Sequence, residues 1–116
     1  MPEFDWKAKY RDRIAPASNA MKMIKPGNSI FIGTGCGQPQ FLVDALVRHS
    51  SHISDAHIIH LLTMGAAPYA HEKFRDKFKM NSFFVADNIR GAMEQGIGDY
   101  TPIFLSEIPR EFESGR

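Results

Sequence analysis

Glycines gather in one short stretch of the chain, IFIGTGCGQPQ, at residues 30–40. Successive glycines ahead of a helix expose backbone N–H groups, and such groups can bind an anion or stabilise a developing oxyanion. The alternative is a tight strand-to-helix turn that binds no ligand. If the turn is a site, its candidate donors are the backbone groups of Gly35, Cys36, Gly37 and Gln38.

Two nucleotide-binding motifs do not fit this glycine turn. A dinucleotide fingerprint needs a third glycine where the chain has Gln38, and an acid after the second strand where it has Thr63-Met64. A Walker loop needs Lys followed by Ser or Thr, and neither pair follows the glycines. Cys36 could serve as a nucleophile ahead of a helix, but we favour a small residue that the turn tolerates.

A second stretch, GAAPY, follows the most continuous apolar run of the chain. Its small residues leave room for a substrate, and its tyrosine either caps a pocket or packs in the core. The candidate substrate loop therefore consists of Gly65, Ala66, Ala67, Pro68 and Tyr69.

Several other polar residues have a structural and a functional interpretation. Asn88 is an N-cap or a substrate contact, with the cap favoured, and Arg90 forms a surface salt bridge or binds a carboxylate. Glu107 is an acid favoured by the helix dipole rather than a nucleophile. His57 and His60 point to opposite faces of one strand and cannot share a metal ion, so no metal site is predicted.

Strands and helices are predicted to alternate along the chain. The predicted strands cover 29–33, 57–63, 82–86 and 100–105, and the predicted helices cover 4–14, 17–24, 41–48, 88–95 and 106–112. Residues 69–78 are either helical or irregular. The helix at 41–48 should bury Leu42, Ala45, Leu46 and His49, Asn88 and Ser106 should cap their helices, and Gly96 should end one.

This alternation is typical of an open, mostly parallel α/β sheet with flanking helices. Ligands of such sheets bind beyond the carboxyl ends of the strands. The glycine turn, the Gly65–Tyr69 loop, Asp87-Asn88 and Ser106-Glu107 all follow predicted strands. The four segments should therefore lie along one edge of the sheet.

Length and composition exclude several classes of protein. The chain has 116 residues, a net charge of +1 and a single cysteine. A near-neutral charge balance argues against nucleic acid as the main partner. No apolar run approaches the ~20 residues that a membrane span needs. The expectation is a cytoplasmic protein that binds neither nucleic acid nor membrane.

Three stretches of the chain, by their order and spacing, resemble the acetyl-CoA hydrolase/transferase family, which includes acetate and 4-hydroxybutyrate CoA-transferases. They are IKPGNSIFIGTGCGQPQFLVDAL, HIIHLLTMGAAPYA and FKMNSFFVADNIRGAMEQGIGDYTPIFLSEIPREF. The resemblance covers about nine tenths of the chain by the order of its elements, all but the first dozen residues. HLLTMGAAPYA and DYTPIFLSEIPR bring it nearest to the 4-hydroxybutyrate branch.

The resemblance implies an enzyme of two similar α/β domains that moves coenzyme A between carboxylic acids or releases it to water. A glutamate of the second domain attacks acyl-CoA, and a glutamyl-CoA thioester follows. Residues 1–116 would be part of the N-terminal domain, with no catalytic residue of their own and no activity alone. Acyl-CoA and a small carboxylic acid would be the substrates, no covalent cofactor is expected, and the full-length enzyme is expected to be a homo-oligomer.

Two other classes of function stay open at this point. One is a sugar-phosphate isomerase or deaminase, because such an enzyme also uses an open sheet and a glycine-rich anion-binding turn. The other is a non-catalytic domain that assembles with a partner chain.

Overall fold

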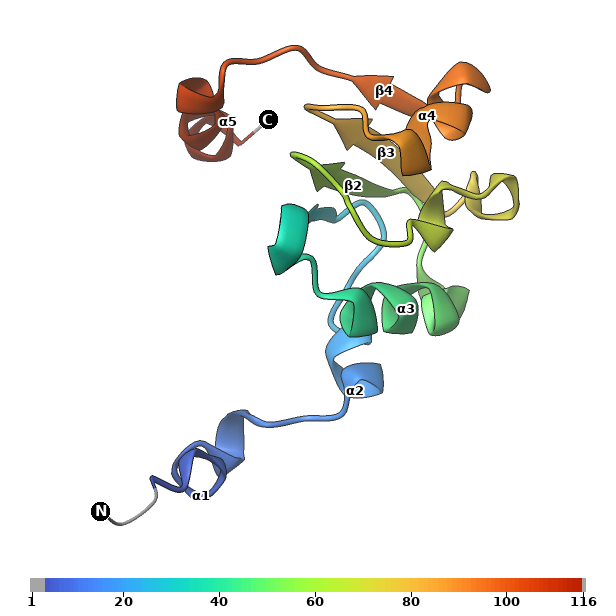
Figure 1. Ribbon diagram of the computed structural model, residues 1–116. Coiled ribbons are helices and arrows are strands. Elements are labelled where there is room, and N and C mark those ends of the chain that lie inside the picture. Colours follow the sequence, from blue (N-terminus) through green and yellow to red (C-terminus); the bar gives the residue numbers. More distant parts are fainter. Residues whose placement is uncertain (1–3, 116) are drawn as a thin grey trace.

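The centre of the protein is a parallel β-sheet whose strands follow one another in space as they do in the chain. The computed structural model describes residues 4–115, so the ends of the predicted 1–116 domain lie outside the described residues. The sheet has the order β1-β2-β3-β4, and each neighbouring pair is parallel. The strands are β1 (Ser29–Ile32), β2 (Ala56–His60), β3 (Phe78–Ser82) and β4 (Gly98–Tyr100) (Figure 1).

Helices and short 3₁₀ turns connect these strands. The α-helices are α1 (Trp6–Lys9), α2 (Ala17–Met21), α3 (Gln40–Arg48), α4 (Asp87–Glu94) and α5 (Ile108–Ser114). The 3₁₀ turns are η1 (Arg11–Arg13), η2 (Gly35–Gly37), η3 (Ser50–His52), η4 (Pro68–Ala70), η5 (Glu72–Phe74) and η6 (Leu105–Glu107). The predicted open parallel sheet with flanking helices is confirmed. Within residues 4–115 no helix is long and apolar enough to cross a membrane.

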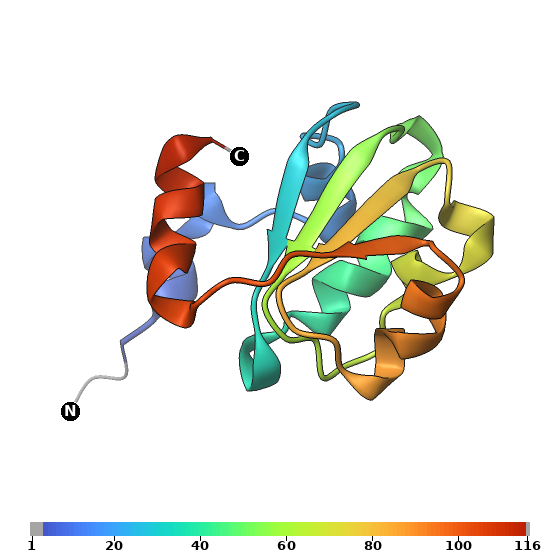
Figure 2. The same ribbon diagram turned by 90° about the horizontal axis from the view of Figure 1, so that it is seen from above.

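The strand order places α3 and α4 on the same face of the sheet (Figure 2). Right-handed crossovers between parallel strands that advance in one direction always pass over one face. The core lies on this face, where Ile58 and Met80 pair in register and pack with Val43, Leu46 and Ile89. The fold is therefore a sheet with one layer of crossover helices.

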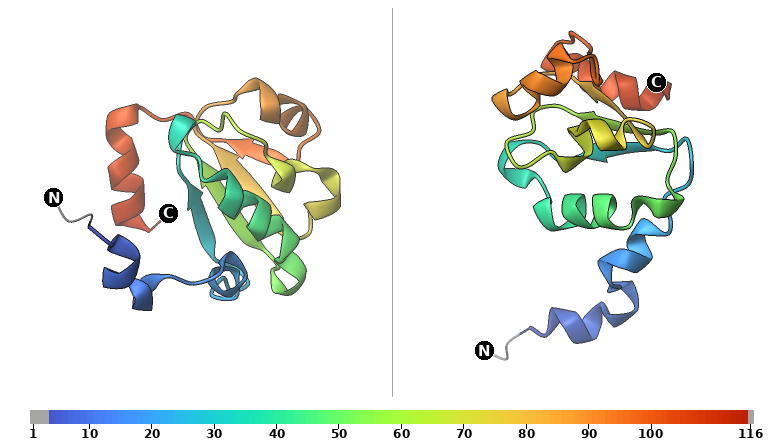
Figure 3. Two further views of the ribbon diagram at one scale, coloured as in Figure 1. Left: turned by 60° about the horizontal axis from the view of Figure 1, so that its bottom comes forward. Right: turned by 90° about the vertical axis from the view of Figure 1, so that its right-hand side faces the viewer.

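The opposite face of the sheet is more open. Phe31, Ile59, Asn81 and Asp99 form one row across it, and none of these side chains is fully buried. α5 covers part of this face, because the ring of Phe112 meets that of Phe31 edge-on at a centroid distance of 5.0 Å. α1 stands at the end of an arm that projects away from the sheet (Figure 1 and Figure 3).

The third strand begins earlier than predicted, at Phe78 instead of Ser82. The prediction followed the apolar run SFFVA, but the strand is the alternating segment FKMNS. Phe78 and Met80 face the core while Lys79 is exposed, which is the period-2 pattern of a strand with one buried face. SFFVA mostly follows the strand as irregular chain.

The fourth strand was also placed too late in the chain. It is β4, Gly98–Tyr100, and Pro102 lies beyond it. A Cβ atom on Gly98 would lie 2.5 Å from Cε of Met80 and 2.9 Å from Sδ of Met93, so a larger residue here would require both methionine side chains to move. Ser106 belongs to η6 and is no cap, because α5 begins at Ile108.

The remaining helix predictions were right about position and wrong in detail. The helix predicted over 4–14 is split into α1 and η1, and the one over 17–24 ends at Met21. In α3 the predicted burial of Ala45 and Leu46 is confirmed, whereas Leu42 is 42% exposed and Val43 is buried in its place. Gly96 ends the α4 segment with φ +70°, as predicted. Residues 69–78 are irregular up to β3, with two 3₁₀ turns.

Candidate functional site

Three of the four predicted loops meet at the carboxyl edge of the sheet. The Gly35 N–H donates to the Leu62 carbonyl at 2.9 Å, and the Thr34 hydroxyl donates to the same oxygen at 3.0 Å. The Asn88 side chain donates to the Gly65 carbonyl. Ser106-Glu107 forms no side-chain hydrogen bond with these loops within residues 4–115. The loops after β1, β2 and β3 are thus one connected surface, while the segment after β4 stays apart from it.

The glycine turn uses most of its own N–H groups internally. Gly37 donates to the Thr34 carbonyl at 3.0 Å and Gln38 to the Gly35 carbonyl at 3.2 Å, in addition to the Gly35 bond to Leu62. Among these turn amides, that of Cys36 alone has no hydrogen-bond acceptor in the part of the chain that the structure describes. The donor that this turn can offer to a ligand in the observed conformation is therefore the Cys36 N–H.

The glycines of the turn have different reasons to be glycine. A Cβ atom on Gly33 would lie 2.9 Å from the Gly37 carbonyl oxygen, and Gly35 has φ +55°. Both positions are therefore required by the backbone of the turn itself. Around Gly37, in contrast, a Cβ atom would meet no atom of the described chain within 4 Å. The fold does not demand Gly37, and its outer side is open.

The side chain of Gln38 joins the glycine turn to the second predicted loop. Its Oε1 atom accepts hydrogen bonds from the Thr63 hydroxyl at 2.6 Å and from the N–H groups of Gly65 at 3.0 Å and Met64 at 3.2 Å. Its Nε2 atom donates to Ala66 O at 3.2 Å. The sequence prediction considered the backbone of Gln38 and overlooked this side chain and Thr63.

Gln40 extends the same network toward α3. Its side chain accepts a hydrogen bond from Gln38 Nε2 at 3.0 Å. It donates to the Ala66 carbonyl at 3.2 Å and to the Asp44 carboxylate at 2.9 Å. The two glutamines thus tie the start of α3, the glycine turn and the second loop into one unit.

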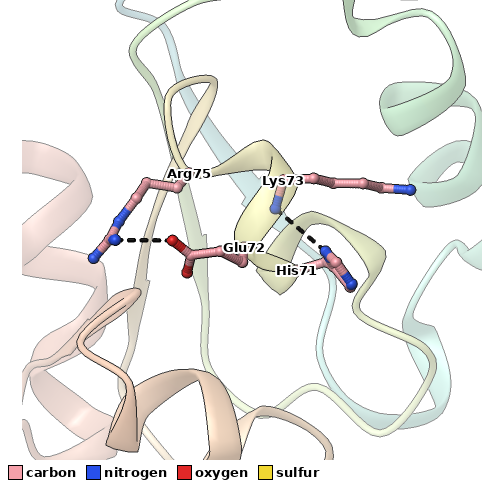
Figure 4. Close-up of polar contacts among 4 residues, drawn as sticks. All are labelled: His71, Glu72, Lys73 and Arg75. Atoms are coloured by element: carbon pink, nitrogen blue, oxygen red, sulfur yellow. Dashed lines mark hydrogen bonds and ion pairs between the residues drawn. The ribbon is translucent and has the colours of Figure 1, made fainter.

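The second loop borders an open groove of about 520 Å³ between itself and α4. Small side chains form much of its wall, and the lining residues include Ala66, Ala67, Pro68, Gly91 and Asn88. His71 and Glu72 also line it, and their polar atoms are engaged nearby: Glu72 pairs with Arg75, and His71 Nδ1 accepts the Lys73 N–H (Figure 4). The groove has room for a small substrate.

Tyr69 lies in the core rather than at the groove surface, with 1% of its surface exposed. Burial raises the pKa of Tyr69 to about 12, and the nearby Thr63 hydroxyl opposes part of this rise. Its hydroxyl has no hydrogen-bond partner within the described residues. Of the two roles that the sequence left open, this burial fits packing.

His60 is a fully buried core histidine. Ser82 has one hydroxyl proton and donates it to the Phe84 carbonyl, so His60 Nδ1 carries the proton that reaches Ser82 Oγ at 2.9 Å. Burial lowers the pKa of His60 to about 4, so the ring is neutral at pH 7. Its Nε2 atom has no hydrogen-bond partner in the described chain.

The other candidate side chains have structural roles. Asn88 is not the predicted cap, because Ala86 is the N-cap of α4; its amide donates to the Gly65 carbonyl, and the residue also lines the groove. Arg90 forms an exposed ion pair with Asp87 at 2.8 Å. His57 is exposed while His60 is buried, so the two point to opposite faces as predicted. Residues 4–115 contain no group of three acidic, histidine or cysteine side chains arranged for a metal ion.

Comparisons with known proteins agree on one family. Residues 2–116 match the acetyl-CoA hydrolase/transferase N-terminal domain. The chain is 30% identical over 112 residues to 4-hydroxybutyrate coenzyme A transferase from Clostridium kluyveri, covering 97% of this chain and 26% of that protein. It is 37% identical over 91 residues to succinyl-CoA:acetate/propanoyl-CoA:succinate CoA transferase from Fasciola hepatica, covering 77% of this chain and 19% of that protein.

A solved structure supports the same fold. The crystal structure of RipA from Yersinia pestis aligns with a TM-score of 0.80 at 20% identity, over 93% of this chain and 28% of that one. This likeness is evidence for the fold alone. The chain spans about a quarter or less of the length of the curated relatives described above.

Proposed function

The chain belongs to the acetyl-CoA hydrolase/transferase family, and from this premise we propose that it forms one wall of the active site of a CoA-transferase. The reaction moves coenzyme A between an acyl-CoA and a short carboxylic acid. Within the chain, the glycine turn Gly35–Gln38 and the loop residues Gly65–Pro68 would face the substrates, while Tyr69 packs beneath them in the core. The proposal extends to the full-length enzyme, because the relatives are several times longer than this chain.

One structural observation carries the proposal beyond the family match. The Gln38 side chain binds both predicted substrate loops at once, through Thr63, Gly65 and Ala66. Two loops that the sequence marked separately are therefore a single surface at the carboxyl edge of a parallel sheet, where ligands of such sheets bind.

The chemistry we propose is thioester exchange through a glutamate outside residues 1–116. The glutamate carboxylate would take the coenzyme A of the first substrate as a glutamyl-CoA thioester and release the first acid. The acceptor carboxylate would then take the coenzyme A and restore the glutamate. Splitting the transfer into two covalent steps keeps the acyl bond activated throughout.

The glycine turn would contribute binding and charge stabilisation to these steps. The Cys36 N–H, which has no acceptor within the described residues, can donate to an oxygen that gains negative charge. The open space at Gly37 lets a substrate approach the backbone closely. The cytoplasmic location and the homo-oligomeric state of the full-length enzyme remain predictions.

The experiment that tests this function uses the full-length protein and looks for the covalent intermediate. Incubation with acetyl-CoA, butyryl-CoA or succinyl-CoA without an acceptor acid should add the mass of CoA less one water to the protein, and an added short carboxylate should remove it. Residues 1–116 expressed alone should gain no such mass under the same conditions. A full-length protein that neither forms the adduct nor transfers CoA to any acid of a short-chain panel contradicts the proposal.

A further inference from the structure

The carboxamide of Gln38 has all of its hydrogen-bonding capacity in use. An amide group offers two N–H donors and an oxygen with two lone pairs. Both donors are engaged, by Gln40 Oε1 at 3.0 Å and Ala66 O at 3.2 Å. The oxygen accepts from Thr63, Gly65 and Met64. A half-buried side chain with every polar atom paired is held in one conformation.

The orientation of this amide follows from its neighbours. Met64 and Gly65 present backbone N–H groups, which can only donate, and Ala66 presents a carbonyl, which can only accept. An amide turned by 180° would set its NH₂ group against two donors and its oxygen against the Ala66 carbonyl. The observed orientation is therefore the one that satisfies all of these backbone groups.

Gly65 makes room for this side chain. A Cβ atom at position 65 would come closest to Gln40 Oε1, and it would lie 2.7 Å from Gln38 Nε2 and 3.1 Å from Gln38 Cδ. A side chain at position 65 would thus require the amide groups of both Gln38 and Gln40 to move from this geometry. Gln38 and Gly65 form a matched pair, although they lie 27 positions apart in the chain.

Gln38 lies two positions after Cys36, whose N–H is the outward donor of the glycine turn. Its bonds therefore fix that donor relative to the second loop. We infer that Gln38 is a positioning residue: it holds the Thr63–Ala66 loop against the glycine turn and so sets the distance between the two parts of the substrate-facing surface. Its catalytic consequence rests on the proposed function, whereas its structural action does not.

Two variants test this inference, and they differ in whether they keep the acceptor oxygen of the Gln38 amide. Gln38→Ala removes the whole group. Gln38→Glu keeps an acceptor for Thr63, Met64 and Gly65 but sets a second oxygen against Gln40 Oε1 and Ala66 O. Asn19→Ala is the matched control, because it removes an exposed amide from α2, far from the site in the chain.

The first measurement is hydrogen–deuterium exchange in the full-length protein, followed in peptides that cover residues 61–67. We expect Gln38→Ala to speed exchange of the Met64 and Gly65 amides at least tenfold, Gln38→Glu to speed it less, and Asn19→Ala to leave it unchanged. Exchange at these amides that stays within twofold of wild type in a folded Gln38→Ala variant overturns the inference. If Gln38→Ala does not fold, Gln38→Glu decides by the same criterion.

The second measurement is steady-state CoA transfer by the full-length enzyme. Gln38→Ala should lower kcat at least tenfold with KM for acyl-CoA within about threefold of wild type, because a displaced donor weakens the transition state more than the ground state. Gln38→Glu should recover part of kcat. If Gln38→Ala exchanges faster but keeps the kcat of wild type, Gln38 does not influence catalysis, and that part of the inference is wrong. If the wild-type enzyme transfers no CoA, the proposed function is wrong. In that case the exchange experiment alone still tests whether Gln38 holds the second loop.

Discussion

The amide of Gln38 lies against Gly65, with Nε2 only 2.7 Å from the place of a Cβ atom on Gly65, and Oε1 of Gln40 shares the same space. Replacing Gly65 by alanine should therefore displace the amides of Gln40 and Gln38 and weaken the hydrogen bonds that Met64 and Gly65 donate to Gln38. We expect Gly65→Ala to lower the free energy of unfolding by about 1–3 kcal/mol, as for other overpacked sites.

Urea denaturation measures this loss, and Gly91→Ala provides its control. Gly91 lies in α4, and a Cβ atom there meets nothing within 4 Å. Gly91→Ala should raise stability by roughly 0.5–1 kcal/mol, since alanine favours a helix interior. If both substitutions have the same sign, the steric account of Gly65 is wrong.

Alanine substitutions at Gly37 and Gly33 should have different effects: the first should lower activity and the second should lower stability. Gly37→Ala adds a methyl group in open space, so its melting temperature should stay near that of wild type. Its CoA transfer in the full-length enzyme should fall at least tenfold, because a displacement of about 1 Å at a reacting centre can cost on the order of 10²-fold. Gly33→Ala brings its Cβ atom to 2.9 Å from the Gly37 carbonyl and should lose stability. A Gly37→Ala enzyme with full activity removes the turn surface from the substrate site.

The exposed thiol of Cys36 offers a direct probe of the same surface. We predict that Cys36→Ser keeps CoA transfer within about threefold, because the proposed role belongs to the backbone N–H and not to the thiol. N-ethylmaleimide should inactivate the wild-type enzyme by adding bulk beside the turn, and Cys36→Ser should resist the same treatment. Loss of activity in untreated Cys36→Ser would instead assign a chemical role to the thiol.

His60 should make the fold sensitive to mild acid. Its pKa is about 4 in the folded chain and 6.5 in its unperturbed state, so below pH 6.5 the unfolded chain binds more protons. Stability should therefore be complete above pH 6.5 and fall as the pH decreases toward 4, by about 2 kcal/mol between pH 7 and pH 5. Urea denaturation at both pH values measures the change.

Two variants show whether His60 causes that loss. His60→Asn keeps an N–H for Ser82 and cannot titrate, so its stability should depend less on pH between 7 and 5. His57→Gln removes an exposed histidine and should leave the wild-type loss intact. Equal pH dependence in all three proteins would exclude His60 as the source.

The aromatic pair of Phe31 and Phe112 should decide how firmly α5 is held. The two rings meet edge-on at 5.0 Å and both remain about half exposed. Phe112→Ala should cost only about 1 kcal/mol of stability, but it should speed hydrogen exchange throughout α5. Exchange in β2 and β3 should not change, since those strands are held by their own ladder and core.

The sequence was sufficient for the fold class because strand and helix signals alternate in it. The predicted strand boundaries were wrong where an apolar run does not coincide with a strand. Residues 82–86 are an example, because the chain leaves the sheet after Ser82. β4 was misplaced because its strand is short and polar, and its position depends on the contact of Gly98 with Met80 and Met93. Contacts of this kind join distant parts of the chain and leave no local pattern.

The candidate site was predictable to the level of loops and not to the level of atoms. The glycine turn and the Gly65–Tyr69 loop were marked by composition, and the rule for parallel sheets placed them at one edge. The amide of Gln38 was not marked, because a glutamine in a loop has no distinctive local signal. Thr63 at the end of an apolar run was the available hint, since a buried hydroxyl there needs a partner.

The order β1-β2-β3-β4 also bears on how the protein can be made. Each strand pairs with the strand that precedes it in the chain, so every new β-strand finds its neighbour already present as the polypeptide leaves the ribosome. The sheet can grow from its N-terminal edge, one strand and one connection at a time, without waiting for distant segments. A nascent chain stalled after β3 should accordingly already contain a paired three-stranded sheet.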